Sequence, residues 1–356
     1  MGMKQVFGKG LLSFPFLFFL FSCDGRTPVD SIPDSVFDRA EVLLPSGELD
    51  YKPSGGESQI YVFGDTLLLV CEKLSEAGRL FTVLNLKTGE DLTPDSLFLY
   101  GAEDGKLMPS IVYRHRDTLL ISDVVKRDIY LISVDDLLAG RKCPPLASDI
   151  KWSANKILPY RGRLLFLNSE CFPEVSEEYH KDGPRFAYTD SSYNYEAPQS
   201  MYSTLSVVTG EYDINWSKGR IIFGDDDVNR IEVYDTDLKL LRILMGRNRF
   251  MPEYACVQNR DGYIFAYTGE ICQAYRAVVS TDEFAYLLYM DSVWIEDEDR
   301  DSFCSYVLKM DWNGNIVTSY RIGAYVKSLS VSENDSCLYA FCLDEHGYRI
   351  LKYDLQ

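Results

Sequence analysis

Beyond an apolar N-terminal segment, the chain is a succession of short runs rich in β-branched and aromatic residues, separated by polar and turn-forming residues. Runs of this length and composition are typical of β-strands. No later stretch of about 12 residues or more keeps a helical periodicity, so we expect little helix. The runs that carry this interpretation are Ile60–Val70, Leu80–Leu86, Thr118–Ser122, Ile129–Val134, Arg163–Leu167, Arg220–Phe223, Arg230–Tyr234, Gly262–Tyr267, Phe284–Tyr289, Ser305–Met310, Cys337–Cys342 and Arg349–Tyr353. The pattern predicts an all-β fold.

Several runs end in a polar turn that leads into a second run, so that a phrase recurs along the chain. The turns of this phrase are Lys87–Glu90, Val208–Glu211, Asp235–Asp237 and Asp311–Gly314. Thr-Gly and Asn-Gly pairs in three of them supply the positive φ that tight hairpins need. Repeats of about 40 to 50 residues with several strands and a hairpin are typical of a β-propeller.

Six units of this kind can be marked out, of which the third and fifth are irregular. Their bounds are 58–100, 107–146, 155–212, 213–250, 254–322 and 323–356. The chain stops at Tyr353–Leu355, where the phrase would begin again, so a strand near Val36–Leu44 should complete the last unit. Closure of this kind removes exposed sheet edges. We therefore expect residues 36–356 to form a six-bladed β-propeller whose N-terminal strand closes the last blade.

The C-terminal half contains phrases that resemble a known family. They are Tyr306–Val317 (YVLKMDWNGNIV), Leu329–Val331, Cys337–Phe341 (CLYAF) and Ile350–Leu355 (ILKYDL), and Leu119–Leu138 is similar to the second blade of the same family. These segments resemble the TolB-like six-bladed propeller lipoproteins of Bacteroidetes. Tyr100–Gly105 departs from the glycine-rich loop that commonly precedes that blade. The resemblance covers most of residues 36–356 and implies a propeller and an envelope location, without implying any chemistry.

The N-terminus has the order of a secretory signal. Lys4 and Lys9 precede the apolar run Leu11–Phe21, and Ser22 and Cys23 follow it. The run is about a dozen residues long, whereas a membrane-spanning helix needs roughly 20. The cysteine after the run resembles a lipobox, although Phe21 is not the usual residue there. We predict a signal over residues 1–22, lipid on Cys23 and a tether over residues 23–35, with an ordinary cleaved signal as the alternative.

The predicted anchor makes the lipid bilayer a partner through Cys23. We expect an exported lipoprotein of the outer membrane, and the sequence leaves open whether it faces the periplasm or the cell exterior. The chain has 36 basic and 54 acidic residues, a net charge of −18, and no basic patch. Nucleic acid is therefore disfavoured as a partner, because its binding requires clustered Lys and Arg.

The nine cysteines include no C-x-x-C pair, which argues against a zinc site. The sequence leaves open whether one or two disulfides form.

No catalytic signature stands out. His115, His180 and His346 fall in three different units beside charged or turn residues, where exposed histidines are common. Nucleophile elbows, H-E-x-x-H and phosphate-binding glycine loops are absent from the sequence. Asp225–Asp227 and Glu296–Asp301 lack the spacing of a calcium loop, and we interpret them as solvated turns rather than calcium ligands. We predict no cofactor and no metal.

Residues 172–201 interrupt the third unit and combine aromatic rings with small polar residues. The candidate ligand-binding residues there are Tyr179, Arg185, Phe186, Tyr188, Tyr193 and Tyr195. Rigid aromatic faces beside hydrogen-bonding groups suit sugar rings, peptides and protein interfaces. The alternative is that these aromatics pack the segment onto neighbouring blades. Trp152, Trp216, Trp294 and Trp312 are predicted to serve interblade packing.

Two functions from different classes remain. The first is a non-catalytic binding module in the envelope that presents propeller loops to a glycan, a peptide or an envelope protein. The second is a propeller enzyme, such as a metal-dependent lactonase or a glycan lyase, which would need several acidic or histidine side chains converging at one end of the central channel. The sequence favours the binding module.

Overall fold

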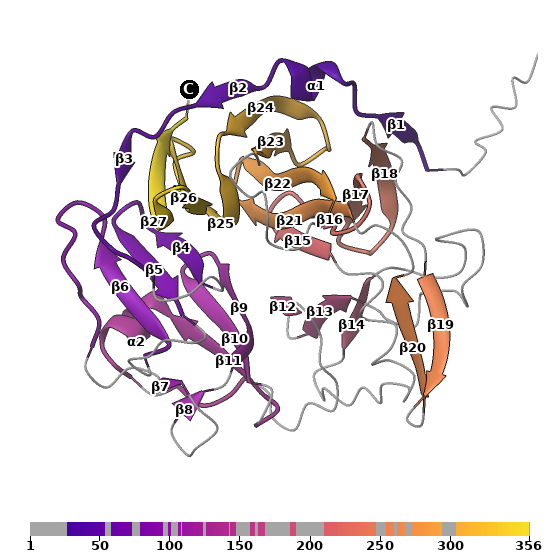
Figure 1. Cartoon of the computed structure of the whole chain (residues 1–356). Coiled ribbons are helices and arrows are strands. Elements are labelled where there is room, and N and C mark those ends of the chain that lie inside the picture. Colours follow the sequence, from indigo (N-terminus) through magenta and orange to yellow (C-terminus); the bar gives the residue numbers. More distant parts are fainter. Residues whose placement is uncertain are drawn as a thin grey trace, which may run out of the picture.

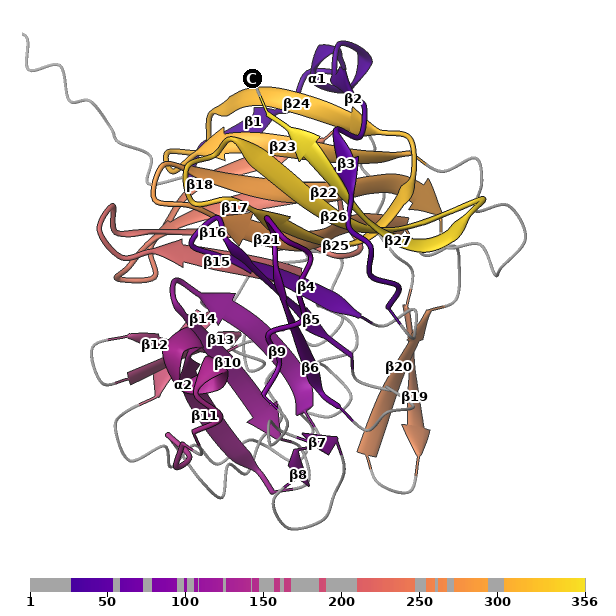
Figure 2. The ribbon, with the colours of Figure 1, turned by 90° about the vertical axis from the view of Figure 1, so that its left-hand side faces the viewer.

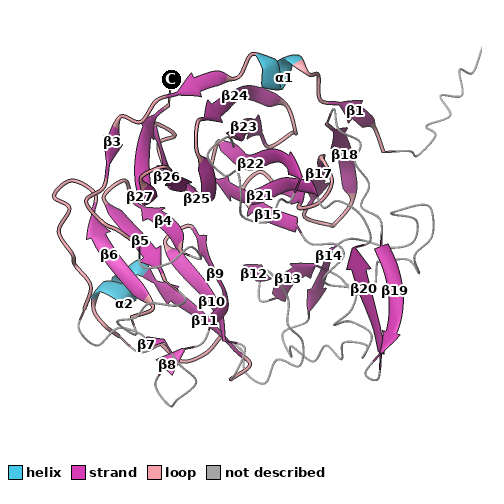
Figure 3. Cartoon of the chain, in the orientation of Figure 1, coloured by secondary structure: helices cyan, strands magenta, loops and turns pink. Residues whose placement is uncertain are grey.

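The structure is a computed structural model, and most of its regular structure is strand (Figure 3). It describes residues 27–53, 58–72, 79–94, 99–100, 106–107, 109–123, 126–141, 143–146, 157–160, 163–167, 186–189, 210–246, 254–259, 262–267, 272–293 and 304–355. Within these ranges the helices are short, α1 (Ser35–Asp38) and α2 (Val134–Leu138). The all-β prediction is confirmed for this part of the chain.

The strands follow one another as antiparallel sheets of three to five strands, arranged as a propeller (Figure 1). In chain order the sheets contain β4 (Gln59–Phe63), β5 (Leu67–Cys71) and β6 (Phe81–Asn85); β9 (Pro109–His115), β10 (Thr118–Asp123) and β11 (Asp128–Ser133); β12 (Ile157–Tyr160), β13 (Arg163–Leu167) and β14 (Phe186–Thr189); β15 (Gly210–Asn215), β16 (Arg220–Asp225), β17 (Arg230–Asp235) and β18 (Leu240–Met245); β21 (Cys272–Ser280), β22 (Phe284–Val293), β23 (Ser305–Asp311) and β24 (Ile316–Ile322); and β25 (Tyr325–Val331), β26 (Cys337–Asp344) and β27 (Gly347–Asp354).

Two further pairs of strands lie outside these sheets. They are β7 (Leu99–Tyr100) with β8 (Lys106–Leu107), which run parallel, and β19 (Tyr254–Asn259) with β20 (Gly262–Tyr267), which form a hairpin. Figure 2 shows the β19–β20 hairpin standing apart from the neighbouring sheets. The sequence predicts Gly262–Tyr267 as a strand of the fifth unit, but within the described residues this strand pairs only with β19.

Apolar clusters join each sheet to the next, which explains why central strands such as β22 are buried over nearly their whole described length. One cluster connects the first and last sheets, with Ile60, Val62 and Leu68 against Phe341 and Ile350. Residues almost 300 positions apart in sequence thus share one core, and the row of sheets turns back on itself. This contact is the physical basis of the closed arrangement.

The N-terminal segment 27–49, which we call the strap, runs along the outer edges of three sheets (Figure 1, indigo). Its strand β1 (Val29–Ser31) pairs with β18 and its strand β2 (Glu41–Leu43) pairs with β24, both in parallel. Its third strand, β3 (Gly47–Glu48), pairs antiparallel with β27 of the last sheet. The predicted closing strand near Val36–Leu44 is therefore misplaced: those residues form part of α1 and β2 on the preceding sheet.

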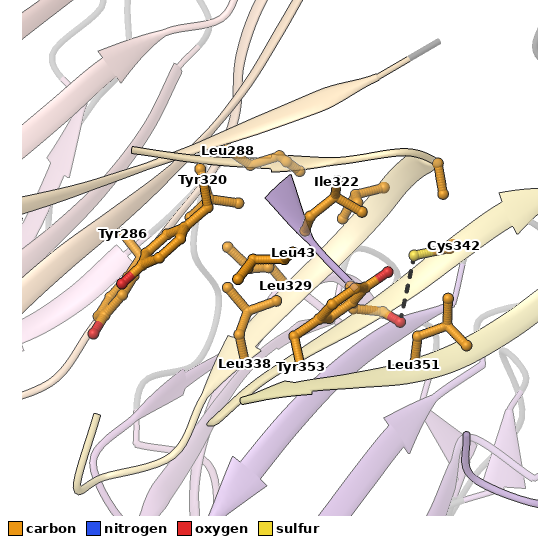
Figure 4. Packing of buried hydrophobic residues seen from close by; sticks show 14 of the residues in the cluster. Leu43, Tyr286, Leu288, Tyr320, Ile322, Leu329, Leu338, Cys342, Leu351 and Tyr353 are labelled. Carbon is orange, nitrogen blue, oxygen red and sulfur yellow. Dashed lines mark hydrogen bonds between the residues drawn. The ribbon is translucent and has the colours of Figure 1, made fainter. Parts of the chain in front are cut away.

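Apolar side chains fix the strap to the sheets beneath it. Leu43 is buried among Ile322, Leu351 and Tyr353, between the last two sheets (Figure 4). In the same cluster the Tyr353 hydroxyl is hydrogen-bonded to the Cys342 sulfur, and burial raises the pKa of the Cys342 thiol to about 12. Cys337 and Cys342 are both free thiols, and their positions five residues apart along one strand keep them from bridging each other.

Arg349 of β27 ties the strap to the last sheet. Its guanidinium donates to Glu48 Oε2 at 2.9 Å and to the Asp344 carboxylate. Partial burial acts to raise the pKa of Asp344, but hydrogen bonds from Arg349 and the His346 backbone N–H outweigh it and lower the pKa below its usual value. A carboxyl whose pKa is lowered by folding stabilises the protein above its unfolded pKa, and this stability is lost as pH falls through the folded pKa.

We therefore expect Asp344→Asn to remove part of the acid sensitivity of the fold. The wild-type free energy of unfolding should fall between about pH 5 and pH 2 more steeply than that of the variant, as measured by urea denaturation at each pH. Asp38→Asn, which removes a carboxylate at an exposed position of the strap, is the matched control. If the free energy of unfolding of Asp344→Asn changed with pH in parallel with that of wild type, the lowered pKa of Asp344 would be contradicted.

The predicted turns are mostly confirmed. Gly89 and Gly314 have φ of 73° and 83°, and Asp311 accepts hydrogen bonds from the backbone N–H groups of Asn313 and Asn315. The predicted turn at Val208–Glu211 is wrong in its second half, because Gly210 and Glu211 already belong to β15. Position 210 requires a glycine for steric reasons, since a Cβ atom at this position would lie 2.2 Å from the Phe223 ring.

Candidate functional site

A cavity of about 710 Å³ lies among the strands β4, β9, β15, β21 and β25, the inner strands of five different sheets. Figure 1 shows these five strands around the middle of the ring. The turns that follow β9, β21 and β25 contribute Asp117, Asp282 and Glu333 to its wall. Residues separated by hundreds of positions therefore share one concave surface, which is where propeller folds gather functional side chains.

Charges of both signs line the cavity. The cations include Arg114, Arg276 and Lys327, and the carboxylates include Glu211, Asp213 and Asp226. Arg276 Nη1 lies 3.9 Å from Asp226 Oδ2, an ion pair beyond hydrogen-bond distance. The Lys327 ammonium lies 5.3 Å from the centre of the Tyr348 ring, a cation–π contact.

Arg114 helps to connect the first two sheets to the last one. It donates from Nη2 to Glu333 Oε1 at 2.9 Å, which joins β9 to the turn after β25, and it stacks over Phe63 at 5.2 Å. The same Glu333 accepts from the Gly64 backbone N–H, so three sheets meet at this carboxylate. Burial lowers the pKa of Arg114, and nearby carboxylates, Glu333 foremost, oppose that effect. Guanidinium groups stay protonated in proteins, so Arg114 keeps its positive charge in this contact.

Other polar groups in the wall are held by the fold. Asp213 accepts from Ser280 Oγ and from the Ile214 backbone N–H, both at 2.8 Å. The Tyr61 hydroxyl donates to Gln59 Oε1 at 3.0 Å. Burial, with smaller contributions from Cys71 and Glu211, raises the pKa of Tyr61 far above its ordinary value, so this phenol stays neutral. Such hydrogen bonds hold the polar side chains of the cavity wall in defined positions.

His115 lies at the end of β9 and lines the cavity, although the sequence predicts an exposed loop histidine. The Trp216 indole N–H donates to His115 Nε2 at 2.9 Å, so this ring nitrogen accepts and carries no proton. His346 is exposed in a turn, as predicted, and His180 lies outside the described residues. Trp312 is buried between sheets as predicted, whereas Trp152 and Trp294 are outside the described part.

The predicted aromatic site falls mostly outside the described residues, which include neither Tyr179, Arg185, Tyr193 nor Tyr195. Tyr188 lies in β14 opposite Leu165. Phe186 is fully buried, with its ring 4.9 Å from Tyr212 and 5.2 Å from Tyr234. Phe186 therefore packs the interior instead of facing a ligand, which is the alternative that the sequence left open.

The acidic run Asp225–Asp227 also differs from its prediction as a solvated turn. Asp225 and Asp227 are buried, and Asp225 Oδ1 accepts from the backbone N–H groups of Asp227 and Val228.

Within the described residues no group of three or more His, Cys, Asp or Glu side chains could hold a metal ion. Glu296–Asp301 lies outside those residues. No described helix is both long and apolar enough to cross a membrane.

Two solved structures are similar to this chain over most of its length. A member of the DUF4221 family from Bacteroides vulgatus superposes with a TM-score of 0.52 at 10% sequence identity, over 87% of this chain and 97% of the other. A protein of Bacteroides fragilis, named as exported, superposes with a TM-score of 0.51 at 14% identity, over 92% and 99%. At these identities the likeness shows the propeller-like fold alone.

No protein-family model and no curated protein matches the sequence. The resemblance to TolB-like lipoproteins therefore stays a prediction, while the propeller arrangement that it implies is supported by the structure. Apart from His115 and Asp226, the charged residues of the cavity wall were not singled out from the sequence. The sequence feature that could have indicated them is a charged residue within the first strand of a sheet, as in the β21 sequence CQAYRAVVS and the β25 sequence YVKSLSV.

Proposed function

We propose that the protein is a lipid-anchored six-bladed propeller that binds a small polar ligand, without catalysis, in the cavity between its inner strands. The observation that carries this proposal is the cavity itself, with its fixed walls and its charges of both signs. Ligand sites in proteins typically measure about 300 to 1,000 Å³ and are largely pre-formed. A cavity of about 710 Å³ fits a mono- or disaccharide or a short peptide better than a folded protein.

The six-bladed part of the proposal is supported by the order of the sheets. Sheets of three or more strands begin at β4, β9, β12, β15, β21 and β25. Each of the six predicted units therefore corresponds to one sheet, although the fourth sheet starts at Gly210, three residues before the predicted start of its unit. The packing of the first sheet on the last supports a closed ring. The strap adds an edge strand to the fourth, fifth and sixth of these sheets.

The anchored part rests on the sequence, because Cys23 lies outside the described residues. The similar protein named as exported supports export. The strap starts at Thr27, on the outer edge of the β15–β18 sheet, so a tether from Cys23 would attach at the rim of the propeller and not across the cavity. A lipoprotein held in this way presents its cavity to solutes of the envelope.

A substitution that fills the cavity tests the proposal. Ala277 lies on β21, where it lines the cavity and packs against the neighbouring apolar cluster, and Ala277→Phe enlarges the side chain at this point of the cavity wall. We expect this variant to bind envelope-derived saccharides or peptides at least about tenfold more weakly than wild type, or about 1.4 kcal/mol. Native mass spectrometry of the purified protein with fractionated envelope extracts can find the ligand, and calorimetry can measure its affinity.

Val317→Phe is the matched control, because Val317 is 55% exposed on the outer strand β24 and the substitution introduces the same ring away from the cavity. Unfolding temperatures of both variants show whether either one has lost its fold. A ligand that binds equally to wild type and to a folded Ala277→Phe variant would place the binding site elsewhere.

A further inference from the structure

The strap carries most of the exposed large apolar side chains in the described part of the chain. Five such side chains are exposed there, and three of them, Val29, Val42 and Leu44, belong to the strap, with exposed fractions of 63%, 59% and 77%. A fourth, Val317, lies on β24, the strand with which β2 of the strap pairs. Apolar residues that gather on one surface indicate an interaction surface, whereas single scattered ones do not. We call these four residues the apolar edge.

From the position of this surface beside the anchor, we infer that the apolar edge docks onto the lipid bilayer that holds the lipid of Cys23. The inference rests on the lipid anchor of the proposed function and goes beyond it. It gives the folded body of the protein a contact of its own with the membrane, and it orients the propeller with the strap towards the bilayer.

The local structure of the strap explains why its apolar residues face outward. Leu43 is buried between the last two sheets, and its two neighbours, Val42 and Leu44, are exposed on the other side. A strand with one face on a core normally carries polar residues on the opposite face, and here those positions are apolar. Figures 1 and 2 both show β1, α1, β2 and β24 along one edge of the molecule, so the apolar edge belongs to one side of the propeller.

The length of chain between the anchor and the strap determines how close this edge lies to the bilayer. The Pro28 carbonyl accepts from the Ile243 backbone N–H at 3.0 Å, so the chain is fixed to β18 from this point on. Cys23 lies four residues before Thr27, and four extended residues span at most about 14 Å. The anchor therefore keeps the strap at a high effective concentration next to lipid, where contacts that are too weak to hold the protein alone can form.

The charges of the strap favour a bilayer of zwitterionic lipid over other partners. The strap has five carboxylates, at Asp30, Asp34, Asp38, Glu41 and Glu48, and one cation, Arg39. Two of the carboxylates are paired with arginines of the sheets beneath, Asp30 with Arg242 at 2.6 Å and Glu48 with Arg349 at 2.9 Å. The acidic excess disfavours an anionic surface. A second copy of the chain would place two acidic straps against each other, which like charges also disfavour.

Quenching of tryptophan fluorescence by brominated lipid tests the docking. The lipidated protein is placed in vesicles of phosphatidylcholine and phosphatidylethanolamine with or without bromine on the acyl chains, and wild type gives the baseline of its four tryptophans. Leu44→Trp should lose most of its added emission, because a docked apolar face lies about 5 to 10 Å into the boundary of headgroups and acyl chains. Leu146→Trp is the matched control and should keep its emission, because Leu146 is also exposed but borders the β9–β11 sheet, which the strap does not join.

Hydrogen exchange provides a second measurement that needs no substitution in the strap. Peptides that cover residues 41–46 should exchange more slowly in the lipidated protein on vesicles than in the Cys23→Ser protein mixed with the same vesicles. Unchanged exchange in these peptides would contradict the docking.

The outcomes separate the docking from the anchor on which it rests. If wild type floats with the vesicles but Leu44→Trp is quenched no more than Leu146→Trp, the anchor stands and the docking is wrong. If wild type does not float with the vesicles, the anchor is wrong and the docking fails with it. A concentration-dependent dimer of the Cys23→Ser protein that is lost on adding Val42→Ser and Leu44→Ser would assign the apolar edge to a second copy and overturn the inference.

Discussion

Phe37→Ala should lower the free energy of unfolding by about 3 to 5 kcal/mol, the range for truncating a buried aromatic residue. Phe37 is the buried residue of α1, with its ring centre 5.1 Å from that of Tyr289 and 5.5 Å from that of Tyr306. Its removal leaves a cavity under the strap, between the strap and the β21–β24 sheet. Denaturant unfolding of the protein without its signal segment measures the loss.

Leu44→Ala is the control for this experiment, because Leu44 lies in the same strap but is 77% exposed. A change within about 0.5 kcal/mol is expected there, as for most surface substitutions. Equal effects of the two substitutions would mean that the strap does not belong to the folded core. The comparison therefore tests whether the N-terminal segment holds the outer edges of the propeller together.

Cys23→Ser should release the protein from the membrane completely. A serine cannot form the thioether that carries the lipid, and an acyl anchor contributes about 0.8 kcal/mol for each buried CH₂ group. We expect the wild type in the detergent-soluble membrane fraction, labelled by radioactive fatty acid, and the variant unlabelled and in the aqueous fraction.

Cys143→Ser serves as the matched control, since Cys143 is a free, half-buried thiol far along the chain from the signal. It should keep both the label and the membrane location. Wild-type protein in the aqueous fraction would support the alternative of an ordinary cleaved signal. A membrane-bound Cys23→Ser variant would show that something other than the lipid holds the chain.

The strands could be predicted from sequence because their signals are local. Runs such as Leu80–Leu86 and Cys337–Cys342 have strand composition, and the Asn313-Gly314 turn needs a positive φ that glycine provides. The run Ile60–Val70 is instead divided into two strands, β4 and β5, by a turn at residues 64–66. The strap was predicted less well, because β1, β2 and β3 have only two or three residues each and pair with strands more than 200 positions away. Nothing local in Val36–Leu44 indicates which sheet edge it will join.

The candidate site was harder to predict for the same reason. Arg276 and Lys327 look like single charges within strands, and only the register of β21 and β25 reveals that each lies on a bulge. The aromatic segment 172–201 attracted attention through its composition, yet Phe186 packs in the core. Aromatic content indicates burial or binding equally well, whereas convergence of inner strands can be judged only in three dimensions.

Hydrogen exchange measured with and without bound ligand tests the central claim, that the ligand occupies the cavity between the inner strands. We predict slower exchange in the peptides that cover the ends of β9, β15, β21 and β25 and the turns at residues 116–117 and 281–282, which border the cavity. Slower exchange confined to residues 172–201, with no change at the inner strands, would contradict the claim and return the binding site to the aromatic segment.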